Sequence, residues 1–566
     1  MLNRKWIYDP LPDEQAVERL SAAINVRASL AAILINRGIC DFDQARKFFR
    51  PDLNDLHDPF KMKDMDRAVE RLNHAIQNRE KILVYGDYDV DGTTAVSVVY
   101  SYLKKLEADC YYYIPDRNKE GYGVSEAGII WAAENNINLI IALDLGIKAT
   151  TIVEQAAVQK IDFIICDHHE PDAELPDAVA VLDPKRADCS YPFKELSGCG
   201  IGFKLLQGYT LKYGNPAEVL EYLDLVAVSI ASDIVPVTGE NRILAFHGLN
   251  QLSTQPRPGL KALIEISGAS KSLNISDVVF TIGPRINAAG RIAHAHGAVE
   301  LLISQTDEEA RMHASAVNLN NSERRGFDLN ITEEALAMID GSSKLLNARS
   351  TVLYKADWHK GVIGIVASRV LEKHYKPTII LTRSNGKLTG SARSVEGFDL
   401  YAAIEACSEL LEKFGGHKYA AGLTLDESNL DAFIKKFERV VSSSITDEML
   451  QPSLHIDAEI KFDQINRSYF NILRQMAPFG PQNLQPVFVS RGVSLYRQPA
   501  LLKEKHVKFS VVQDDIVLNA ICFGRPELYE MLMTADQPFN IAFNIEENSY
   551  NNVTSLQLRI KDIQFP

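Results

Sequence analysis

The segment GDYDVDG places three aspartates, Asp87, Asp89 and Asp91, on alternate positions and closes with Gly92. This spacing matches the start of an EF-hand calcium loop, which needs ligands at its first, third and fifth positions and glycine at the sixth. The match fails at the twelfth position, where Val98 stands in place of a bidentate glutamate. The preceding KILVY is a short apolar run, so we expect a strand that leads into an acidic turn and a helix, as in α/β enzymes.

Further acidic residues also follow apolar segments. They are Asp144 after INLIIAL, Asp167 with His168 and His169 after IDFIIC, and Asp233 at the end of a predicted buried helix over 219–232. Ligands of a doubly wound sheet bind beyond the carboxyl ends of its strands, so these groups should converge. Converging carboxylates repel one another unless cations neutralise them, and aspartates with imidazoles suit Mn²⁺ or Mg²⁺. A carboxylate that bridges two ions gives a two-metal site for phosphoester hydrolysis.

Each of these features also has an ordinary structural interpretation. DxDxDG can be a turn with capping carboxylates, DHH a helix N-cap beside surface histidines, Asp144 a turn residue and Asp233 a helix cap. Four such features at element ends within one α/β unit favour a metal site over four unrelated turns.

The composition sets limits on the protein class. A chain of 566 residues, 46% hydrophobic and 24% charged, is typical of a globular protein of several domains. Its net charge of -14 gives no overall attraction to nucleic acid, so DNA binding would need a local basic groove. The N-terminal residues lack the apolar core of a signal peptide and no run is long enough to span a membrane, so we expect a cytoplasmic protein without membrane contact. Seven scattered cysteines without a CxxC pair indicate neither a disulfide framework nor a zinc ribbon.

The order of elements predicts an α/β fold with added domains. Apolar runs from Lys81 onward (KILVY, CYYYI, INLIIAL, IDFIIC, AVAVL) predict strands buried on both faces, hence a doubly wound, mostly parallel sheet. A second α/β pattern includes a helix over DLYAAIEACSELLEKFG, and short alternating segments near the C-terminus predict a small β-barrel. The predicted parts are a helical segment 1–78, a metal-binding domain 79–255, a helical connector 256–345, a second α/β domain 346–448 and a barrel 449–566.

Two loops could bind phosphate. GSARS offers a turn, the hydroxyls of Ser391 and Ser394, and Arg393, a set suited to a terminal phosphate; alone it could be a strand-end loop, and FGG a helix C-cap. SGCGIG lacks full GxGxxG spacing and is better interpreted as a helix start. In the barrel, a basic run and two aromatic residues could follow a DNA backbone and stack on bases: Lys503, Lys505, His506, Lys508, Phe479 and Tyr496.

The motifs GDYDVDG, DLG, DHHEP and SDIVPV, in this order, resemble the DHH phosphoesterase superfamily. IPDRNKEGYG, GPRINAAGR, GSARS and FGGHKYAAGL extend the resemblance from about Lys81 onward, and it is closest to the single-strand-specific 5′ to 3′ DNA exonucleases of that superfamily. The resemblance implies a DHH domain, a DHH-associated domain and an oligonucleotide-binding (OB-fold) barrel. It also implies two-metal hydrolysis of phosphodiester bonds to 5′-mononucleotides in DNA repair and recombination.

Residue roles follow from the same resemblance. The ligands of two Mn²⁺ or Mg²⁺ ions would be Asp87, Asp89, Asp91, Asp144, His168 and Asp233, with His169 and Asp167 as catalytic residues. Substrate would be bound by Arg117, Arg285, Arg291, Ser391, Arg393, Gly415, Gly416 and His417. Members of the superfamily often have His at Tyr85 and Asn at Leu145, positions that concern the shell of the first metal.

Other functions remain open at this point. One is another DHH hydrolase, acting on oligoribonucleotides, cyclic dinucleotides or pyrophosphate; the other is an inactive replication scaffold of the same fold. The arginine-bearing helical segment and the barrel favour the exonuclease, and the retained carboxylates favour an active enzyme. The expected partners are single-stranded DNA, single-strand-binding protein and a helicase, and we expect a monomer.

Overall fold

The computed structural model describes residues 4–117, 119–269, 272–550 and 553–566, and it divides into two compact units. The N-terminal unit comprises Pro12–Asn321 and Ser468–Gln485. The C-terminal unit comprises Ser322–Arg467 and Pro486–Pro566, together with the described residues before Pro12. Each unit is described by itself below.

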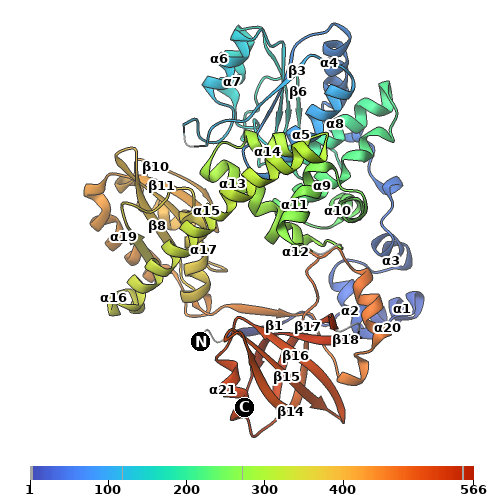
Figure 1. The fold of residues 1–566 in the computed structure, drawn as a ribbon, viewed down its shortest axis with the longest axis vertical. Helices are drawn as coiled ribbons and strands as arrows, with labels where there is room; N and C mark the ends of the chain where they lie inside the picture. The colour runs from blue at the N-terminus through green and yellow to red at the C-terminus, as the bar shows by residue number, and fades with distance from the viewer. Residues whose placement is uncertain (1–3, 118, 270–271, 551–552) are drawn as a thin grey trace. The chain divides into compact units, whose positions relative to one another are not determined.

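A five-stranded parallel sheet in the order β3-β2-β4-β5-β6 forms the centre of the N-terminal unit (Figure 1). Its strands are β2 (Ile82–Gly86), β3 (Cys110–Tyr113), β4 (Leu139–Leu143), β5 (Asp162–Cys166) and β6 (Ala180–Leu182). All residues of β2 and β4 are buried because helices cover both faces. One face packs on α4 (Met65–Gln77), α5 (Val90–Lys105) and α8 (Gly198–Tyr213), and the other on α6 (Glu126–Glu134) and α7 (Thr150–Val158). The predicted doubly wound sheet is confirmed.

Helices follow the sheet, as the sequence predicts. The buried helix is α9 (Leu223–Ser232), and SGCGIG is the start of α8, with Ser197 as its N-cap. The remaining helices are α10 (Gly239–Thr254), α11 (Pro258–Ser267), α12 (Ile275–Asp277), the π-helix η4 (Val278–Ile282), α13 (Gly283–Ile292), α14 (His296–Ile303) and α15 (Asp307–Asp340).

The N-terminal segment differs in part from the helical prediction. Helices α1 (Glu14–Ile24), α2 (Ala28–Asn36) and α3 (Phe42–Phe49) are present, but β1 (Lys5–Tyr8) is a strand that pairs in parallel with β12 (Ser453–Ile456). Its partner lies far along the chain, so local spacing does not reveal the pairing. Ser468–Gln485, which includes most of α20 (Arg467–Gln475), belongs to the N-terminal unit, where buried Arg242 donates hydrogen bonds to the carbonyls of residues 476–478.

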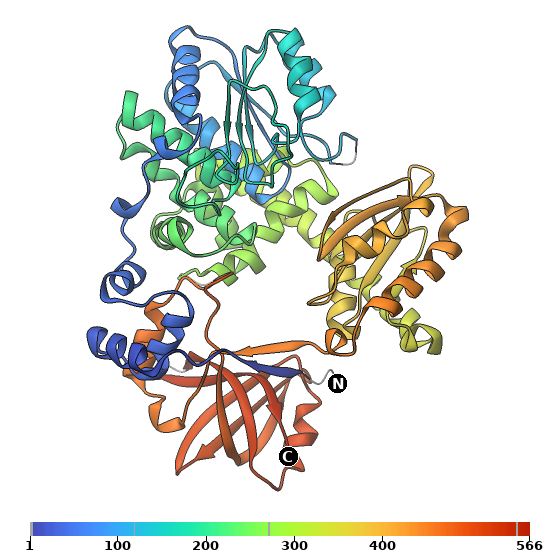
Figure 2. The same cartoon turned by 180° about the vertical axis from the view of Figure 1, so that it is seen from behind.

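A mixed sheet in the order β10-β11-β9-β8-β7 forms the second α/β region (Figure 2). Its strands are β7 (Thr351–Tyr354), β8 (Thr378–Ser384), β9 (Lys387–Arg393), β10 (Lys413–His417) and β11 (Ala420–Leu425), and its helices are α16 (Ser343–Asn347), α17 (Ile363–His374), α18 (Leu400–Glu405) and α19 (Leu430–Ser444). Only β7 and β8 are parallel.

Two expectations for this region are wrong, and one alternative is excluded. The helix expected over 399–415 ends at Glu405, and Lys413–His417 form β10. Gly415 and Gly416 therefore are not a helix C-cap, because they pair with Gly422 and Ala421 of β11. The first four residues of GSARS, 390–393, lie in β9 rather than in a turn. Backbone pairing with a neighbouring strand overrides the local helical spacing here.

A closed five-stranded barrel lies at the C-terminal end of the chain, as predicted. Its strands are β14 (Phe488–Leu502), β15 (His506–Gln513), β16 (Ile516–Phe523), β17 (Phe539–Tyr550) and β18 (Val553–Gln564). The order β14-β15-β16-β18-β17 closes through pairing of β17 with β14, and α21 (Leu528–Met533) follows β16. The two-residue strand β13 (Ala458–Glu459) pairs with the start of β14.

Candidate active site

Acidic residues stand at the carboxyl ends of β2, β4 and β5. Asp87 follows β2, and Asp89 is the N-cap of α5 and accepts a hydrogen bond from the Gly92 amide. Asp144 follows β4 with a φ of 62°, and Asp167 follows β5. Strands that are parallel end at one edge of the sheet, so their following residues meet there.

His168 lies at the centre of this cluster. Its Nε2 is 3.2 Å from Oδ1 of Asp144, 3.5 Å from Oδ2 of Asp233 and 3.9 Å from Oδ2 of Asp91. Over the described part of the chain, three sets of side chains bring potential ligand atoms within 4.8 Å of one another: Asp144, His168 and His169; Asp91, His168 and Asp233; and Asp87, Asp89 and Asp144. The structure thus brings all six predicted metal ligands together, and Asp144 and His168 each belong to two sets.

Asp91 is held rigidly within the cluster. Its carboxylate accepts hydrogen bonds from the amides of Gly198 (2.6 Å) and Cys199 (2.8 Å) and from the hydroxyl of Ser229 (2.7 Å). The two amides belong to the first turn of α8, where free N–H groups and the helix dipole favour a negative charge. Gly198 must lack a side chain, since a Cβ there would lie 2.6 Å from Cβ of Asp144.

The electrostatics of the cluster favour bound cations. Burial and then the charge of Asp89 raise the pKa of Asp87 to about 8, while burial and then the charge of Asp91 raise the pKa of Asp233 to about 9. Oδ1 of Asp87, Nε2 of His168 and Oδ2 of Asp233 are buried and have no hydrogen-bond partner in the described structure. Buried carboxylates that repel one another, beside an imidazole nitrogen without a hydrogen-bond partner in the described structure, suit divalent cations.

Asp167 orients His169 rather than joining the metal sets. Its Oδ1 is 2.7 Å from Nδ1 of His169 and accepts from the His168 amide, and its Oδ2 accepts from the Ile147 amide. Burial alone would raise the pKa of Asp167, but these bonds lower it. Burial alone would lower the pKa of His169, but the bond to Asp167 raises it. His169 is therefore a fixed imidazole that can carry a proton at the edge of the cluster.

Tyr122 is a neighbour of this pair that the sequence did not single out. Its hydroxyl lies 3.2 Å from Nε2 of His169. The glycines on either side, Gly121 and Gly123, have positive φ angles, so the EGYG loop needs residues without side chains. The sequence signal that could have identified Tyr122 is its position between two glycines inside IPDRNKEGYG.

Two of the three predicted substrate residues of the N-terminal unit, Arg117 and Arg291, lie near the DYD turn. The Arg117 guanidinium is 5.1 Å from the Tyr88 ring, and its charge acts on Asp87. Arg285 and Arg291 are both on α13, and Arg285 donates a 3.0 Å hydrogen bond to Asn318. Helix α13 packs closely on the turn, because a Cβ at Gly290 would lie 2.8 Å from the carbonyl oxygen of Tyr88.

The other predicted substrate residues lie in the C-terminal unit, on β9 and β10, which are separated by β11. Arg393 donates a 3.2 Å hydrogen bond to the Ser391 hydroxyl in β9. A Cβ at Gly364, in the first turn of α17, would lie 2.9 Å from that hydroxyl oxygen, so the start of α17 adjoins the pair. Exposed residues of β10 pair through β11 with this region: Gly415 opposite Gly422 opposite Ser391, Gly416 opposite Ala421 opposite Ala392, and His417 opposite Ala420 opposite Arg393.

Several other predicted positions differ in their surroundings. Tyr85 and Leu145 pack in the hydrophobic cluster beneath α6 and α7, and Tyr85 donates a hydrogen bond to Ser125, so neither joins the metal sets. Phe479 lies in the N-terminal unit and not in the barrel, whereas Tyr496 is exposed on β14.

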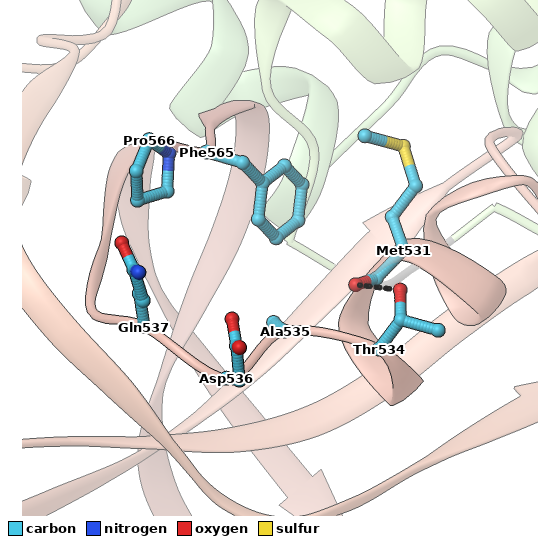
Figure 3. Close-up of a pocket in the computed structure, with 7 residues that line it drawn as sticks. All are labelled: Met531, Thr534, Ala535, Asp536, Gln537, Phe565 and Pro566. Carbon is cyan, nitrogen blue, oxygen red and sulfur yellow. Dashed lines mark hydrogen bonds between the residues drawn. The ribbon is translucent and has the colours of Figure 1, made fainter.

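Figure 3 shows a pocket beside α21 whose side chains include Asp536 and Phe565 but no basic residue, so it does not suit a phosphate backbone. In the described residues, no helix is both long enough and apolar enough to span a membrane.

Comparison with known proteins agrees with this geometry. The model of the DHH family, N-terminal domain, matches residues 81–230, the DHHA1 domain matches 347–443 and the RecJ OB domain matches 456–562. The Bacillus subtilis (strain 168) single-stranded-DNA-specific exonuclease RecJ is 37% identical over 555 residues, which cover 97% of this chain and 70% of that protein. The crystal structure of RecJ from Thermus thermophilus in complex with Mn²⁺ superposes with a TM-score of 0.85 at 26% identity, over 99% of this chain and 80% of that one. Its complex with Mg²⁺ shares the fold, with a TM-score of 0.79 at 24% identity over 99% and 78%.

An aspartate and histidine cluster at the edge of a parallel sheet, followed in the chain by a DHHA1 domain, defines a phosphoesterase of the DHH class. Within this class, the additional barrel and the similarity over nearly the whole chain identify the family. The chain belongs to the RecJ family of single-stranded-DNA-specific exonucleases.

Proposed function

We propose that this protein hydrolyses single-stranded DNA from its 5′ end and releases 5′-mononucleotides, with two Mn²⁺ or Mg²⁺ ions. The observation that carries this proposal is the cluster of five aspartates, three of them within 4 Å of His168 Nε2, with buried ligand atoms that lack hydrogen-bond partners in the described structure. The relatives are exonucleases by name, and the solved Thermus structures hold Mn²⁺ or Mg²⁺.

The chain's own residues prepare the site for this reaction. The metal ligands would be Asp87, Asp89, Asp91, Asp144, His168 and Asp233, and the ions would activate a water and stabilise the leaving oxygen. Asp91 is fixed by α8 and Ser229, so its carboxylate does not turn away when the site is empty of substrate. His169 is oriented by Asp167 and can hold a proton against the scissile phosphate, while Tyr122 contacts its ring.

The 5′ polarity would follow from a phosphate anchor. Ser391 and Arg393 present a hydroxyl and a guanidinium side by side, a pair suited to a terminal phosphate, and Arg117 lies near the metal ligands. We propose that Ser391 and Arg393 bind the 5′ phosphate and that Gly415, Gly416 and His417 of the same unit contact the strand. In the N-terminal unit, we propose Arg117, Arg285 and Arg291 as further substrate-binding residues.

The competing functions are less well supported. A cyclic-dinucleotide phosphodiesterase, an oligoribonuclease or a pyrophosphatase does not require the OB barrel that matches residues 456–562. An inactive scaffold would not need to keep every carboxylate in ligand geometry. We further propose a cytoplasmic monomer with the five-part domain division given above. It would act in repair and recombination on strands supplied by a helicase and covered by single-strand-binding protein.

The test uses 5′- and 3′-labelled oligonucleotides, single- and double-stranded, each with Mn²⁺, Mg²⁺ or chelator. We expect metal-dependent release of label from the 5′ end of the single strand first, and little cleavage of blunt duplex. Cleavage in chelator, or first release from the 3′ end, would contradict the proposal.

A further inference from the structure

The inward face of α15 changes character along its length. Toward its C-terminal end, Ile331, Ala335 and Ile339 pack in a hydrophobic cluster with α17. One and two turns earlier on the same face, at the spacing of three or four residues, stand Asp328 and Arg324. A polar pair thus interrupts the apolar face in the middle of α15, between Val317 and Ile331, which belong to hydrophobic clusters. A buried ion pair contributes little net stability compared with apolar packing, so this replacement needs another explanation.

Asp328 is the centre of a basic cluster in the C-terminal unit. Its side chain is fully buried, and its Oδ2 lies 2.7 Å from Nη2 of Arg369 on α17 and 4.0 Å from Nη1 of Arg324. Arg325, which directly follows Arg324 on α15, is exposed. One carboxylate therefore faces two arginines, with a third beside them, and the cluster keeps a net positive charge.

The two paired arginines differ in exposure. The Arg369 side chain is 40% exposed, whereas that of Arg324 is 11% exposed. A guanidinium has five donors in a fixed fork, and a carboxylate on one side leaves the other side able to meet a second anion. Asp328 thus restrains Arg369 from the buried side, while part of the Arg369 side chain faces solvent.

An aromatic pair adjoins the cluster. The Phe327 ring, 42% exposed, stacks on the His359 ring with centroids 4.9 Å apart and an interplanar angle of 17°. His359 is itself fixed, because its Nδ1 accepts a 3.1 Å hydrogen bond from the Gly361 amide. Basic side chains beside an exposed stacked ring are the combination that binds single strands without sequence preference.

We propose that Arg324 and Arg369, positioned by Asp328, bind a backbone phosphate of single-stranded DNA, and that Phe327 on His359 contacts an adjoining base. This site rests on the proposed function and is separate from the Ser391 and Arg393 pair, which adjoins α17 at Gly364. Asp328 is a positioning residue, since its own charge would repel DNA.

The test measures binding of a fluorescein-labelled oligo(dT) strand to the full-length protein in chelator, so that cleavage does not interfere, at several NaCl concentrations. Each phosphate contact to a single strand contributes about 0.7 to the slope of log K against log salt. We expect Arg369→Gln to reduce the steepness of that slope by about 0.7, and Phe327→Ala to weaken binding about fivefold or more with less change in slope. Arg383→Gln is the matched control, because Arg383 is an exposed arginine of the same unit that pairs with Glu427.

The change in DNA affinity caused by Asp328→Asn has opposite signs for the two possible roles of Asp328. If charge alone mattered, removal of a carboxylate beside DNA would tighten binding; if Asp328 positions the arginines, binding weakens although no positive charge is lost. An unchanged slope in Arg369→Gln, or tighter binding by Asp328→Asn, would overturn the site. Should Asp328→Asn fail to fold, the Arg369→Gln slope decides alone. Absence of single-strand binding by the wild type would instead overturn the proposed function.

Discussion

Stability of the metal-free protein should fall as pH rises through the neutral range. An unfolded aspartate titrates near 4, whereas the pKa values of Asp87 and Asp233 are about 8 and about 9 in the fold. Between these limits the folded protein holds protons that the unfolded chain has lost, so the free energy of unfolding decreases with increasing pH. The decrease is up to about 1.4 kcal/mol per pH unit for each such group, or about 3 kcal/mol for the two.

Cations should reverse this trend. They bind the ionised ligands, so their affinity and the stabilisation they give increase with pH. The assay is chemical denaturation between about pH 5.5 and 7.5, in chelator and in Mn²⁺. We expect the two curves of unfolding free energy to diverge as pH rises.

Asp144→Asn isolates the contribution of the cluster from that of other titrating groups. Asparagine adopts the positive φ of position 144 readily, so the backbone should be unaffected. In chelator the variant should be more stable than the wild type at the upper end of the pH range, and the difference should shrink toward the lower end. A difference that is independent of pH, or of opposite sign, would refute the claim that buried carboxylate repulsion prepares this site for cations.

Three further predictions concern activity. His168→Ala should abolish hydrolysis with the fold retained, as measured by nuclease assay and circular dichroism; substantial activity in saturating Mn²⁺ would contradict its ligand role. Asp167→Asn should reduce kcat about tenfold or more at unchanged DNA affinity, because it loses a charge-assisted bond of about 1.5–3 kcal/mol that orients His169; an equal rise in KM with constant kcat would instead indicate a binding role. Arg393→Ala should cost about 1–3 kcal/mol in affinity for 5′-phosphorylated strands but not for 5′-hydroxyl strands, and a preference equal to that of the wild type would remove Arg393 from the anchor.

The sequence predicted those parts of the molecule in which local pattern and tertiary environment agree. Strands β2 and β4 are apolar throughout because both faces are covered, and each is followed by an aspartate because loops at that edge carry the chemistry. Burial and function therefore impose their patterns on adjacent residues, and the motifs could be found without the fold.

Pairing with distant segments explains the errors. β1 forms because it pairs in parallel with β12, and β10 forms because it pairs antiparallel with β11, although LLEKFGG continues a helical spacing. In both cases backbone hydrogen bonds to a strand remote in the chain, or one that follows a turn, decide the conformation, and no local periodicity records them. The residues of GSARS proposed to bind phosphate do lie next to one another, but strand geometry, and not a turn, brings Ser391 and Arg393 together on one face, two residues apart.

The Asp328 cluster marks a different limit. In the sequence, RRGFD is a charged stretch of the arginine-bearing helical segment, and its pattern does not show which of its side chains are buried. Only the packing of α15 on α17 shows that Asp328 is buried and that Arg369 approaches it from another helix. A buried carboxylate at a position where the stripe of Ile331, Ala335 and Ile339 calls for an apolar residue is a local violation of the folding pattern, and such violations are expected where function competes with stability. The same reasoning covers Asp91, a second buried carboxylate, which accepts three hydrogen bonds. It explains why the residues that hold a site in place are harder to find than the residues that face the substrate.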